Sequence, residues 1–513
     1  MKRIGIDVGG THTDAVLMNG MDVLAAVKTK TTRDVTQGIE KAILKLLGKA
    51  NCSPASIQAV MLGTTHFTNA IIEAKNLAPI AAIRAGLPAT KALPPMIDWP
   101  ARLTKVLGDA TYLCHGGCEF DGRPISLIDK NEIQHIAVDI RQRKINSIAI
   151  TSVFSPMNAS CEEDIAALLA AELPDCYFSL SSKMGGPGLL YRENAAILNA
   201  CLREMANGML GNLKSMMNAN GMPCPLYISQ NDGTLMSAEY ARDYPIMTFS
   251  SGPTNSMRGA AYLSSQKNCI VVDIGGTTTD VGLIINGFPQ EAPFETEIGG
   301  VRTNFRMPHL LSIGLGGGSR IKCEDQLEIG PESTGYNLKQ DALIFGGNVL
   351  TATDIAVAAN HIDLGNRAAV SHLDESLITS VLDLAEKNIL DAIDKIKISK
   401  TEYPVVIVGG GSILINEKSS AFSQLIKPEY HAVANAIGTA IAKISGEVDK
   451  IVDISSLSRK EVIELAKQEA IKKARAAGAM PGSIEIVDVE EIPLTYLSGT
   501  TLRLRVKAVG ELL

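Results

Sequence analysis

The pattern of apolar and polar positions repeats once along the chain. Residues 4–6 form an apolar run that ends on Asp7, and a Gly-Gly-Thr turn separates it from a second apolar run after Asp14. Residues 270–272 form a similar run that ends on Asp273, followed by the same turn and a further apolar run after Asp280. Each stretch predicts a buried strand, a glycine turn and a second strand, and so a β-hairpin instead of a strand-to-helix loop.

Two stretches with the same frame indicate an internal duplication, and their residue types are typical of phosphate binding. Paired glycines let backbone amides approach phosphate oxygens, and the following threonine hydroxyls can donate to the same oxygens. An aspartate at the end of each first strand is placed to hold hydrated magnesium, which needs few protein carboxylates. One such hairpin could equally be an ordinary turn, but two favour a clamp on a triphosphate. The residues concerned are Asp7, Gly9, Gly10, Thr11, Thr13, Asp273, Gly275, Gly276, Thr277 and Thr278.

Further glycine clusters follow other apolar runs. Residues 314–319 follow the run 310–313, and Gly409–Gly411 follow the buried strand expected at 405–408. A helix is expected within 432–444, where small residues allow either tight helix packing or contact with a nucleotide base. The shorter signals at 63–66 and 250–253 are compatible with ordinary turns.

The C-terminal residues predict a small separate unit. Ser458 and Glu461 form a capping box before an amphipathic helix that is expected to stop near Gly478 and Pro481. Residues 484–489 and 502–507 alternate as exposed strands do. We expect a strand–helix–strand–strand unit that serves subunit contact.

Composition excludes several classes of protein. The 513 residues are 46% hydrophobic and 20% charged, which is typical of globular domains and leaves room for several. The net charge of -7 argues against nucleic-acid or anionic-membrane partners. An apolar signal segment before Ile4 and an apolar run long enough for a membrane span are both missing, so we expect a cytoplasmic protein.

The nine cysteines are scattered and odd in number, which favours reduced thiols. Cys114 and Cys118 form one tight cluster around His115. Metal sites usually need a second pair or further ligands, so metal or redox chemistry and a loop with incidental thiols both stay open.

Taken together, these stretches resemble the hydantoinase/oxoprolinase A-type subunits, which belong to the superfamily of acetate kinase, sugar kinases, heat-shock proteins and actin. The resemblance runs in the family's order over roughly residues 1–445. It is carried by residues 5–14, 63–70, 192–200, 251–253, 273–280, 314–319 and 353–354.

The resemblance implies an α/β fold of two duplicated actin-like (ribonuclease H-like) lobes with mixed sheets, an ATP cleft between the lobes and a small C-terminal α+β appendage. We expect the first lobe in residues 1–180, the second in 181–445 and the appendage in 446–513. By the resemblance, Asp7 and Asp273 help to hold Mg–ATP, the glycines and threonines of the two loops line the phosphates, and Gly409, Gly410 and Gly411 lie on the adenosine side.

The resemblance also implies an activity. Enzymes of this family use ATP to phosphorylate the carbonyl oxygen of a small cyclic amide such as a hydantoin, 5-oxoproline or a lactam, or to activate a ketone for carboxylation. A B-type subunit usually completes the reaction, and a homo-oligomer is a further expectation. The alternative is an ATP-driven activator of the same fold without a small-molecule substrate, with an iron–sulfur variant that would use Cys114 and Cys118 across a dimer.

A basic side chain is expected beside the transferring phosphoryl group. Arg306 is the leading candidate for this catalytic role, with Arg302 and Arg192 as others, although an arginine is also a common partner in surface or interdomain ion pairs. The histidines His66, His115 and His309 are secondary candidates for substrate or metal contact.

Overall fold

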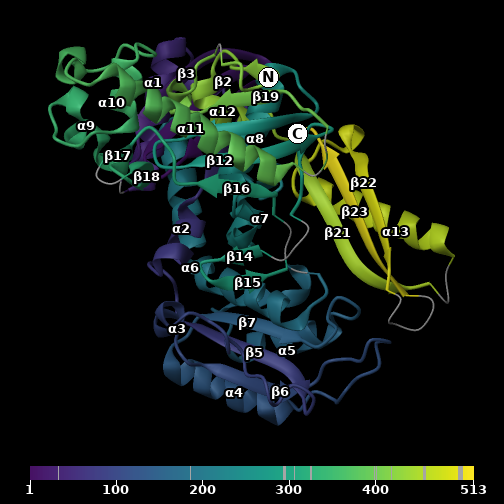
Figure 1. The fold of residues 1–513 in the computed structure, drawn as a ribbon. Coiled ribbons are helices and arrows are strands. Elements are labelled where there is room, and N and C mark those ends of the chain that lie inside the picture. The colour runs from purple at the N-terminus through teal and green to yellow at the C-terminus, as the bar shows by residue number, and fades with distance from the viewer. Residues whose placement is uncertain are drawn as a thin grey trace.

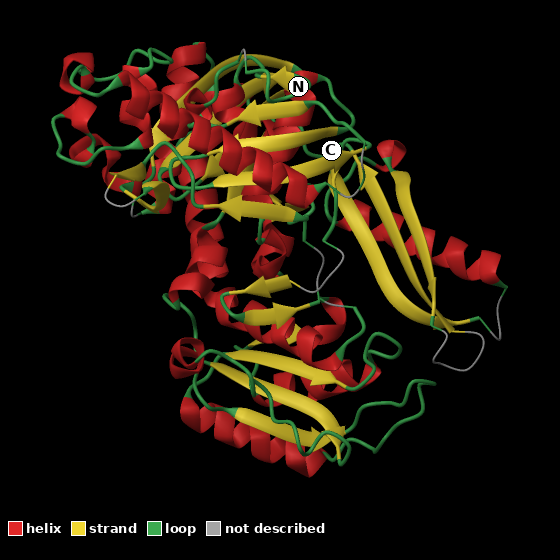
Figure 2. Cartoon of the chain, in the orientation of Figure 1, coloured by secondary structure: helices red, strands yellow, loops and turns green. Residues whose placement is uncertain are grey.

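The computed structural model describes residues 1–32, 34–184, 186–292, 296–304, 307–323, 326–397, 399, 401–417, 419–454, 458–494 and 501–512 (Figure 1). No helix within these ranges combines the length and the hydropathy that a bilayer crossing requires. Sheets and helices alternate throughout, as the cartoon in Figure 2 shows. This arrangement confirms the expected α/β class.

The first large sheet contains the first phosphate hairpin. β1 (Lys2–Val8) pairs antiparallel with β2 (His12–Asn19) and parallel with β4 (Ala59–Thr64). In the described part of the chain the sheet has nine strands in the order β22-β23-β21-β10-β9-β4-β1-β2-β3. The remaining strands are β3 (Asp22–Lys30), β9 (Leu226–Ser229), β10 (Leu235–Ser237), β21 (Ile444–Asp453), β22 (Glu485–Pro493) and β23 (Thr501–Gly510).

The second large sheet repeats the same local arrangement. β11 (Cys269–Ile274) pairs antiparallel with β12 (Thr279–Ile285) and parallel with β19 (Val405–Val408). In both hairpins the two aspartates face each other in register, Asp7 with Asp14 and Asp273 with Asp280. Both expected hairpins and the internal duplication are therefore confirmed. The other described strands of this sheet are β13 (Phe288–Pro289), β16 (Leu310–Ile313) and β20 (Leu425–Ile426).

A smaller parallel sheet lies below the two large ones in Figure 1. It consists of β6 (Thr111–His115), β5 (Ile80–Leu87), β7 (Ser147–Ser152) and β8 (Tyr177–Leu180), in that order. The helices α4 (Lys130–Arg143) and α5 (Ser160–Glu172) accompany it, and the long helix α6 (Leu189–Ala219) packs against β7 and β8 and reaches up toward the first sheet. Two ribbons, β14 (Thr296–Ile298) with β15 (Val301–Thr303) and β17 (Ser319–Cys323) with β18 (Leu327–Ser333), complete the described pairing.

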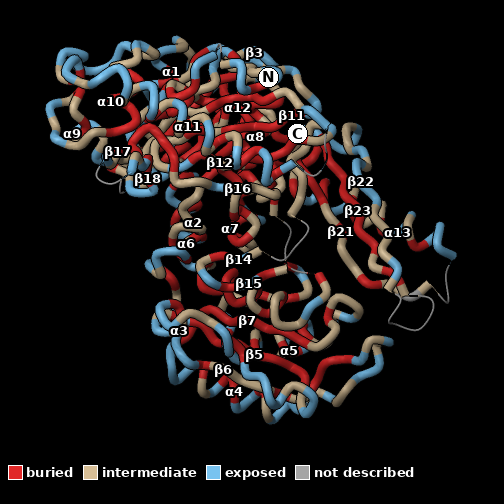
Figure 3. The backbone as a smooth tube through the Cα atoms, viewed as in Figure 1, coloured by how far each residue is buried: buried red, intermediate tan, exposed pale blue. Residues whose placement is uncertain are grey.

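Helices cover the faces of the sheets, and the buried segments in Figure 3 follow the strands. The first sheet has α1 (Val35–Ala50) against β2 and β3, and the second has α11 (Glu375–Ile396) against β12. The asparagine-bearing helices α8 (Ser251–Ser264) and α12 (Ala434–Ala440) lie between the two sheets and contact each other. The shorter helices are α2 (His66–Glu73), α3 (Ala101–Leu107), α7 (Ala238–Asp243), α9 (Leu338–Asp341) and α10 (Ala352–Ala358).

The crossing of α8 and α12 is tight because glycines lie at the contact. A Cβ atom on Gly438 would overlap the carbonyl oxygen of Asn255, and one on Gly259 would overlap that of Ala434. Gly5 of β1 likewise leaves room for the backbone of α12 at Ala436. The small residues expected to permit close packing at 432–444 therefore do so, and a base contact on this helix stays a prediction.

The C-terminal residues form the expected strand–helix–strand–strand unit, and α13 (Arg459–Ala476) begins with the predicted capping box of Ser458 and Glu461. One expectation is wrong, because β23 is largely buried instead of exposed. It lies between β21 and β22 and is covered by α13. The ranges 1–180, 181–445 and 446–513 stay a proposal for domain boundaries, and the first sheet draws strands from all three.

We predict that Gly438→Ala destabilises the protein by about 3 kcal/mol, because the added methyl group forces two helix backbones apart. Gly208→Ala is the matched control, since Gly208 lies within α6 and a Cβ atom there would meet nothing within 4 Å. That control should be neutral or stabilise by about 0.5–1 kcal/mol, because alanine favours the helix. Urea unfolding of both variants measures the difference, and equal effects would contradict the crossing described here.

Candidate functional site

The two glycine turns have the same internal geometry. The amide of Gly9 donates to the carbonyl oxygen of His12 at 3.0 Å, and the amide of Gly275 donates to that of Thr278 at 2.8 Å. Each turn follows directly on the strand that ends in its aspartate, Asp7 or Asp273. The repeated sequence pattern is therefore a repeated backbone conformation.

The two turns approach each other across the space between the sheets. A Cβ atom on Gly276 would lie 3.6 Å from the hydroxyl oxygen of Thr11. Residues from one hairpin can thus reach a group that is bound to the other, as a clamp on a phosphate chain requires.

A third glycine loop holds the second turn in place. The amide of Gly317 donates to the carbonyl oxygen of Gly275 at 3.0 Å, and that of Gly318 donates to Gly276 at 2.7 Å. The loop is fastened in turn by the hydroxyl of Thr353, which donates to the carbonyl oxygen of Gly317 at 2.6 Å. The cluster at 314–319 therefore supports the second phosphate loop from behind.

The glycine turn at 409–411 also lies against the second hairpin. The amide of Gly411 donates to the carbonyl oxygen of Ile274 at 2.7 Å. Gly409 has φ +87°, and a Cβ atom there would overlap a carboxylate oxygen of Asp273. A Cβ atom on Gly410 would meet nothing within 4 Å, so its open side is free of neighbours in the described structure. The structure therefore places this turn against the second hairpin, and its place on the adenosine side stays a prediction.

The two shorter motifs come to the first hairpin. Gly63 pairs with Asp7 in the sheet, and a Cβ atom on it would lie 2.5 Å from the Asp7 carboxylate. A Cβ atom on Gly252, at the start of α8, would lie 3.3 Å from the side chain of Thr65 and 4.0 Å from the carboxylate of Asp7. Both motifs are therefore part of the site and not separate turns.

Three aspartates, two of them buried, gather where the hairpins meet. Asn435 of α12 donates to Asp7 and to Asp14, each at 3.0 Å. Lys28 pairs with Asp14 at 3.0 Å. Asp273 lies close enough to raise the pKa of Asp7 by charge repulsion. The amide of Asn435 and the ammonium group of Lys28 thus offset part of the negative charge of this cluster.

Burial raises the pKa of Asp7 to about 7, and Asp14 and Asp273 add to the shift, while the amides of Asn255 and Asn435 oppose it. Burial and the charge of Asp14 also raise the pKa of Asp273, against a hydrogen bond with Ser256 and the charge of Lys28. The carboxyl of Asp280 has its pKa raised to about 6, mainly by burial. Each of these shifts makes the protonated form of that carboxyl more stable than it is in water.

This donor set suits magnesium. The Oδ1 atoms of Asp7 and Asp14 are buried and accept no well-formed hydrogen bond from the described residues. The described residues contain no group of three or more His, Cys, Asp or Glu side chains arranged for a metal ion. Magnesium keeps several waters and binds through one or two carboxylates together with phosphate oxygens, so Asp7 and Asp273 would be sufficient.

The expected basic residues lie elsewhere or outside the description. Arg306, the leading candidate, lies outside the described residues. Arg192 is buried below the large sheets, where its guanidinium donates to Ser152 and Ser181. Arg302 is exposed on β15. Arg192 therefore has a structural role, which corrects its place among the candidates.

One of the three candidate histidines lies beside the first hairpin, and the other two do not. His66 begins α2, and its amide donates to the hydroxyl of Thr64 beside the first hairpin. His115 pairs with Glu132 at 2.7 Å on the smaller sheet. The ring nitrogen Nδ1 of His309 is buried without a hydrogen bond among the described residues. Of the three, only His66 lies next to a residue of the site.

The thiols of Cys114 and Cys118 are buried in the smaller sheet and its loop. Burial, with the nearby Cys161, raises the pKa of the first to about 12 and that of the second to about 11. Protonated thiols are poor metal ligands and poor nucleophiles. These observations favour incidental thiols over the metal or redox alternative.

Four site residues escaped the sequence reasoning: Lys28, Asn255, Ser256 and Asn435. Asn255 and Ser256 come shortly after the Ser-Gly-Pro motif, and Asn435 lies in the helix expected from small residues. Their place next to the motif at 250–253 and within the helix expected at 432–444 was the sequence signal that could have identified them as site residues. Lys28 had none, because it meets Asp14 only through the pairing of β2 with β3.

Comparison with known proteins agrees with this geometry. The family model "Hydantoinase/oxoprolinase N-terminal region" matches residues 3–173, and the model "Hydantoinase/oxoprolinase" matches residues 192–369. The chain is 27% identical over 392 residues to the caprolactamase subunit alpha of Pseudomonas jessenii, which covers 70% of this chain and 54% of that one. It is 24% identical over 404 residues to the acetophenone carboxylase gamma subunit of Aromatoleum aromaticum, with 71% and 54% covered. The chain spans about half the length of these two relatives.

Two solved structures share the fold over the whole chain. The ATP-dependent caprolactamase from Pseudomonas jessenii has a TM-score of 0.79 at 18% identity, and nucleotide-free acetone carboxylase has a TM-score of 0.72 at 16% identity. Each comparison covers 100% of this chain and 88% of the other. The chain therefore shares the fold of these two proteins, in agreement with the expected α/β fold with mixed sheets.

The raised pKa of Asp7 predicts an unusual dependence of stability on pH. An unfolded aspartate has a pKa near 3.8, so between about pH 4 and 7 the folded protein holds the proton more tightly than the unfolded chain. The free energy of unfolding, measured without magnesium, should therefore fall as the pH rises through this window. Asp7→Asn should remove roughly 2–4 kcal/mol of that fall.

The control is Asp109→Asn, because the side chain of Asp109 is 93% exposed. Urea unfolding at several pH values compares the three proteins. Parallel stability curves for wild type and Asp7→Asn would show that Asp7 titrates normally.

Proposed function

Because the chain belongs to the hydantoinase/oxoprolinase family, we propose that it binds ATP between its two hairpins and uses it to activate a small cyclic amide. The substrate would be of the hydantoin, 5-oxoproline or lactam type, and the enzyme an ATP-dependent amidohydrolase. The observation that carries the proposal is the approach of Thr11 to Gly276, which brings two phosphate loops to one space.

Hydrolysis of a cyclic amide by water alone is slow, and the proposed use of ATP accounts for how the enzyme would accelerate it. An unstrained amide resists water because its carbonyl carbon is a weak electrophile. In the proposed reaction the amide oxygen attacks the γ-phosphorus of ATP, and the bond from that phosphorus to the bridging oxygen of ADP breaks. Water then adds to the carbon and the C–N bond of the ring opens, which leaves an acyl phosphate. A second water hydrolyses the acyl phosphate to the carboxylate and inorganic phosphate. The net reaction consumes ATP, two waters and the amide and yields ADP, phosphate and the ring-opened acid.

The chain's contribution would be positioning and charge stabilisation. Amides of Gly9, Gly10, Gly275 and Gly276 and the hydroxyls of the adjacent threonines would bind phosphate oxygens, and Gly409–Gly411 would lie beside the adenosine. Magnesium, when bound, offsets the charge of the phosphates. Asp7 and Asp273 would hold it, and Asn435 and Lys28 keep the surrounding carboxylates in place.

Partners are part of the proposal. Three of the related proteins are named as subunits, alpha, gamma and beta. We therefore propose that a B-type subunit completes the reaction, and that the assembly contains more than one copy of this chain. Because two of these relatives are carboxylase subunits, a ketone is the second class of acceptor to test.

We predict that Asp7→Ala and Asp273→Ala each lower magnesium-dependent ATP turnover by about 100-fold or more, because each removes a charge that holds the metal–nucleotide complex. Asp109→Asn should leave turnover unchanged. The assay measures ADP release by the chain together with its B-type partner, with and without a panel of lactams, hydantoins and ketones.

Stimulation by a cyclic amide with ring opening supports the amidohydrolase, and stimulation by a ketone with bicarbonate supports the carboxylase type. Turnover that responds to none of these compounds, but rises when another protein binds, would favour the ATP-driven activator. Unchanged turnover in both aspartate variants would remove the nucleotide assignment itself.

A further inference from the structure

Two lysines of β3 lie beside the first phosphate turn. The antiparallel pairing of β3 with β2 sets Lys28 opposite Asp14 and Lys30 opposite His12. Directly opposed residues of such a pair project from the same face of the sheet, so each lysine lies on the side of its partner. The ring atom Nδ1 of His12 lies 3.1 Å from the hydroxyl oxygen of Thr11. Lys30 therefore stands next to the turn itself.

The backbone that follows Lys30 braces the same turn. The hydroxyl of Thr31 donates to the carbonyl oxygen of Gly9 at 2.8 Å, and the amide of Thr31 donates to that of Thr11 at 3.1 Å. Lys30 is itself an exposed residue, and a lysine ammonium group is carried on a flexible stem. The backbone at Lys30 is thus fixed against the turn, while its charged end can move.

The side chain of Lys30 also reaches the second phosphate turn. Its ammonium group lies over the ring of Tyr336, 5.0 Å from the ring centroid. Tyr336 belongs to the short 3-10 helix Gly335–Asn337, and a Cβ atom on Gly335 would lie 3.7 Å from the side chain of Thr277. One lysine therefore extends from the first turn to a ring that lies beside the second.

The charges around the first turn favour an anion. Burial lowers the pKa of His12, and the charge of Lys28 lowers it further while that of Asp14 opposes the shift. Lys339 and Lys30 also lower it, so three cations lie near one residue of this hairpin. Lys28 is paired with Asp14 at 3.0 Å. Within the described ranges, Lys30 pairs with no carboxylate and contacts an aromatic ring instead.

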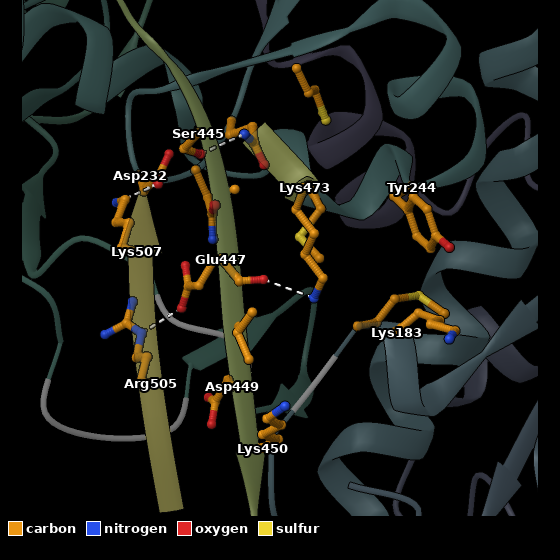
Figure 4. A pocket seen from close by; sticks show the side chains of 18 of the residues that line it. Lys183, Asp232, Tyr244, Ser445, Glu447, Asp449, Lys450, Lys473, Arg505 and Lys507 are labelled. Atoms are coloured by element: carbon orange, nitrogen blue, oxygen red, sulfur yellow. Dashed lines mark hydrogen bonds and ion pairs between the residues drawn. The ribbon is translucent and has the colours of Figure 1, made fainter. Parts of the chain in front are cut away.

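Lysines elsewhere in the structure show a different arrangement. A cavity of about 740 Å³ lies between β21, α13 and the loops above the smaller sheet, and Figure 4 looks into it. There Lys507 pairs with Asp232 at 2.5 Å, and Lys450 pairs with Glu469 at 2.7 Å. An anion could bind these lysines only by separating a charge pair. Lys30 needs no such separation, because an aromatic ring holds a cation weakly and carries no opposite charge.

We infer that Lys30 binds the phosphate chain of the nucleotide, and that the ring of Tyr336 keeps its ammonium group beside the turns without neutralising it. The inference rests on the proposed function for the identity of the ligand, a nucleoside triphosphate. It gives to Lys30 the role of the basic side chain for which the sequence favours Arg306.

The charge balance of the site explains why a further cation is needed. A triphosphate with one magnesium ion keeps a net negative charge, and it would lie close to the carboxylates of Asp7 and Asp273. Lys28 offsets only part of this charge, because it is already paired with Asp14. Lysine supplies a compact charge with three donors that can turn toward phosphate oxygens.

The test measures nucleotide binding and not turnover, and its probe is the non-hydrolysable triphosphate AMPPNP with magnesium. Isothermal titration of the full chain compares wild type with two variants. Lys30→Met should weaken binding about tenfold or more, because it removes a charge-assisted contact with phosphate. Lys30→Arg keeps the charge and should stay within a few-fold of wild type.

Two more variants separate a ligand from a structural contact. Lys45→Met, at an exposed position of α1, changes the net charge by the same amount as Lys30→Met and should leave binding unchanged. Tyr336→Leu removes the ring but keeps the lysine, so its affinity should equal or exceed that of wild type. If Lys30 and Tyr336 only held the two turns together, Tyr336→Leu would weaken binding as much as Lys30→Met. Thermal unfolding verifies that each variant is folded.

The outcomes distinguish this inference from the proposed function. Wild-type affinity in Lys30→Met would overturn the inference alone, as would a loss in Lys30→Arg, Lys45→Met or Tyr336→Leu that equals the loss in Lys30→Met. Failure of the wild-type chain to bind AMPPNP would overturn the proposed function itself, and the inference with it.

Discussion

The tight crossing of α8 and α12 is the constraint on which the site depends. Each helix carries an asparagine to the same aspartate, and both amides reach Asp7 only because Gly259 and Gly438 let the two backbones touch. Since α8 leads into β11 and α12 packs on β1, this single contact also fixes how the two sheets face each other. The approach of Thr11 to Gly276 is a result of that registration.

The charges at the centre of the proposed site cost the protein stability. Three carboxylates lie close together, two of them buried, and the described cation beside them is Lys28. A protein optimised for stability alone would replace some of them with apolar groups. Their retention is understandable if a divalent cation with its phosphates completes the set.

Much of the fold could be predicted from local patterns. The two hairpins, the strand at 405–408 and the capped helix after Ser458 each leave a periodic or capping signal within a short window. The burial of β23 left no such signal, because its alternating residues are enclosed by strands that are distant in sequence. The same holds for Asn435, whose side chain meets Asp14 only through long-range packing. Lys28 meets Asp14 through the register of two adjacent strands, which no local motif indicates. Arg192 was a candidate for the phosphate site because of its charge. In the structure its guanidinium donates instead to a carbonyl and a hydroxyl group beside the smaller sheet.

The connection between α12 and β21 has a mechanical consequence. The helix ends at Ala440 and the strand starts at Ile444, so only three residues separate them. A link this short has little slack, and β21 is held further by its ladder with β23. Any displacement of α12 would therefore be passed on to β21. The packing of α12 on β1 and the position of β21 are in this way connected by one continuous stretch of backbone.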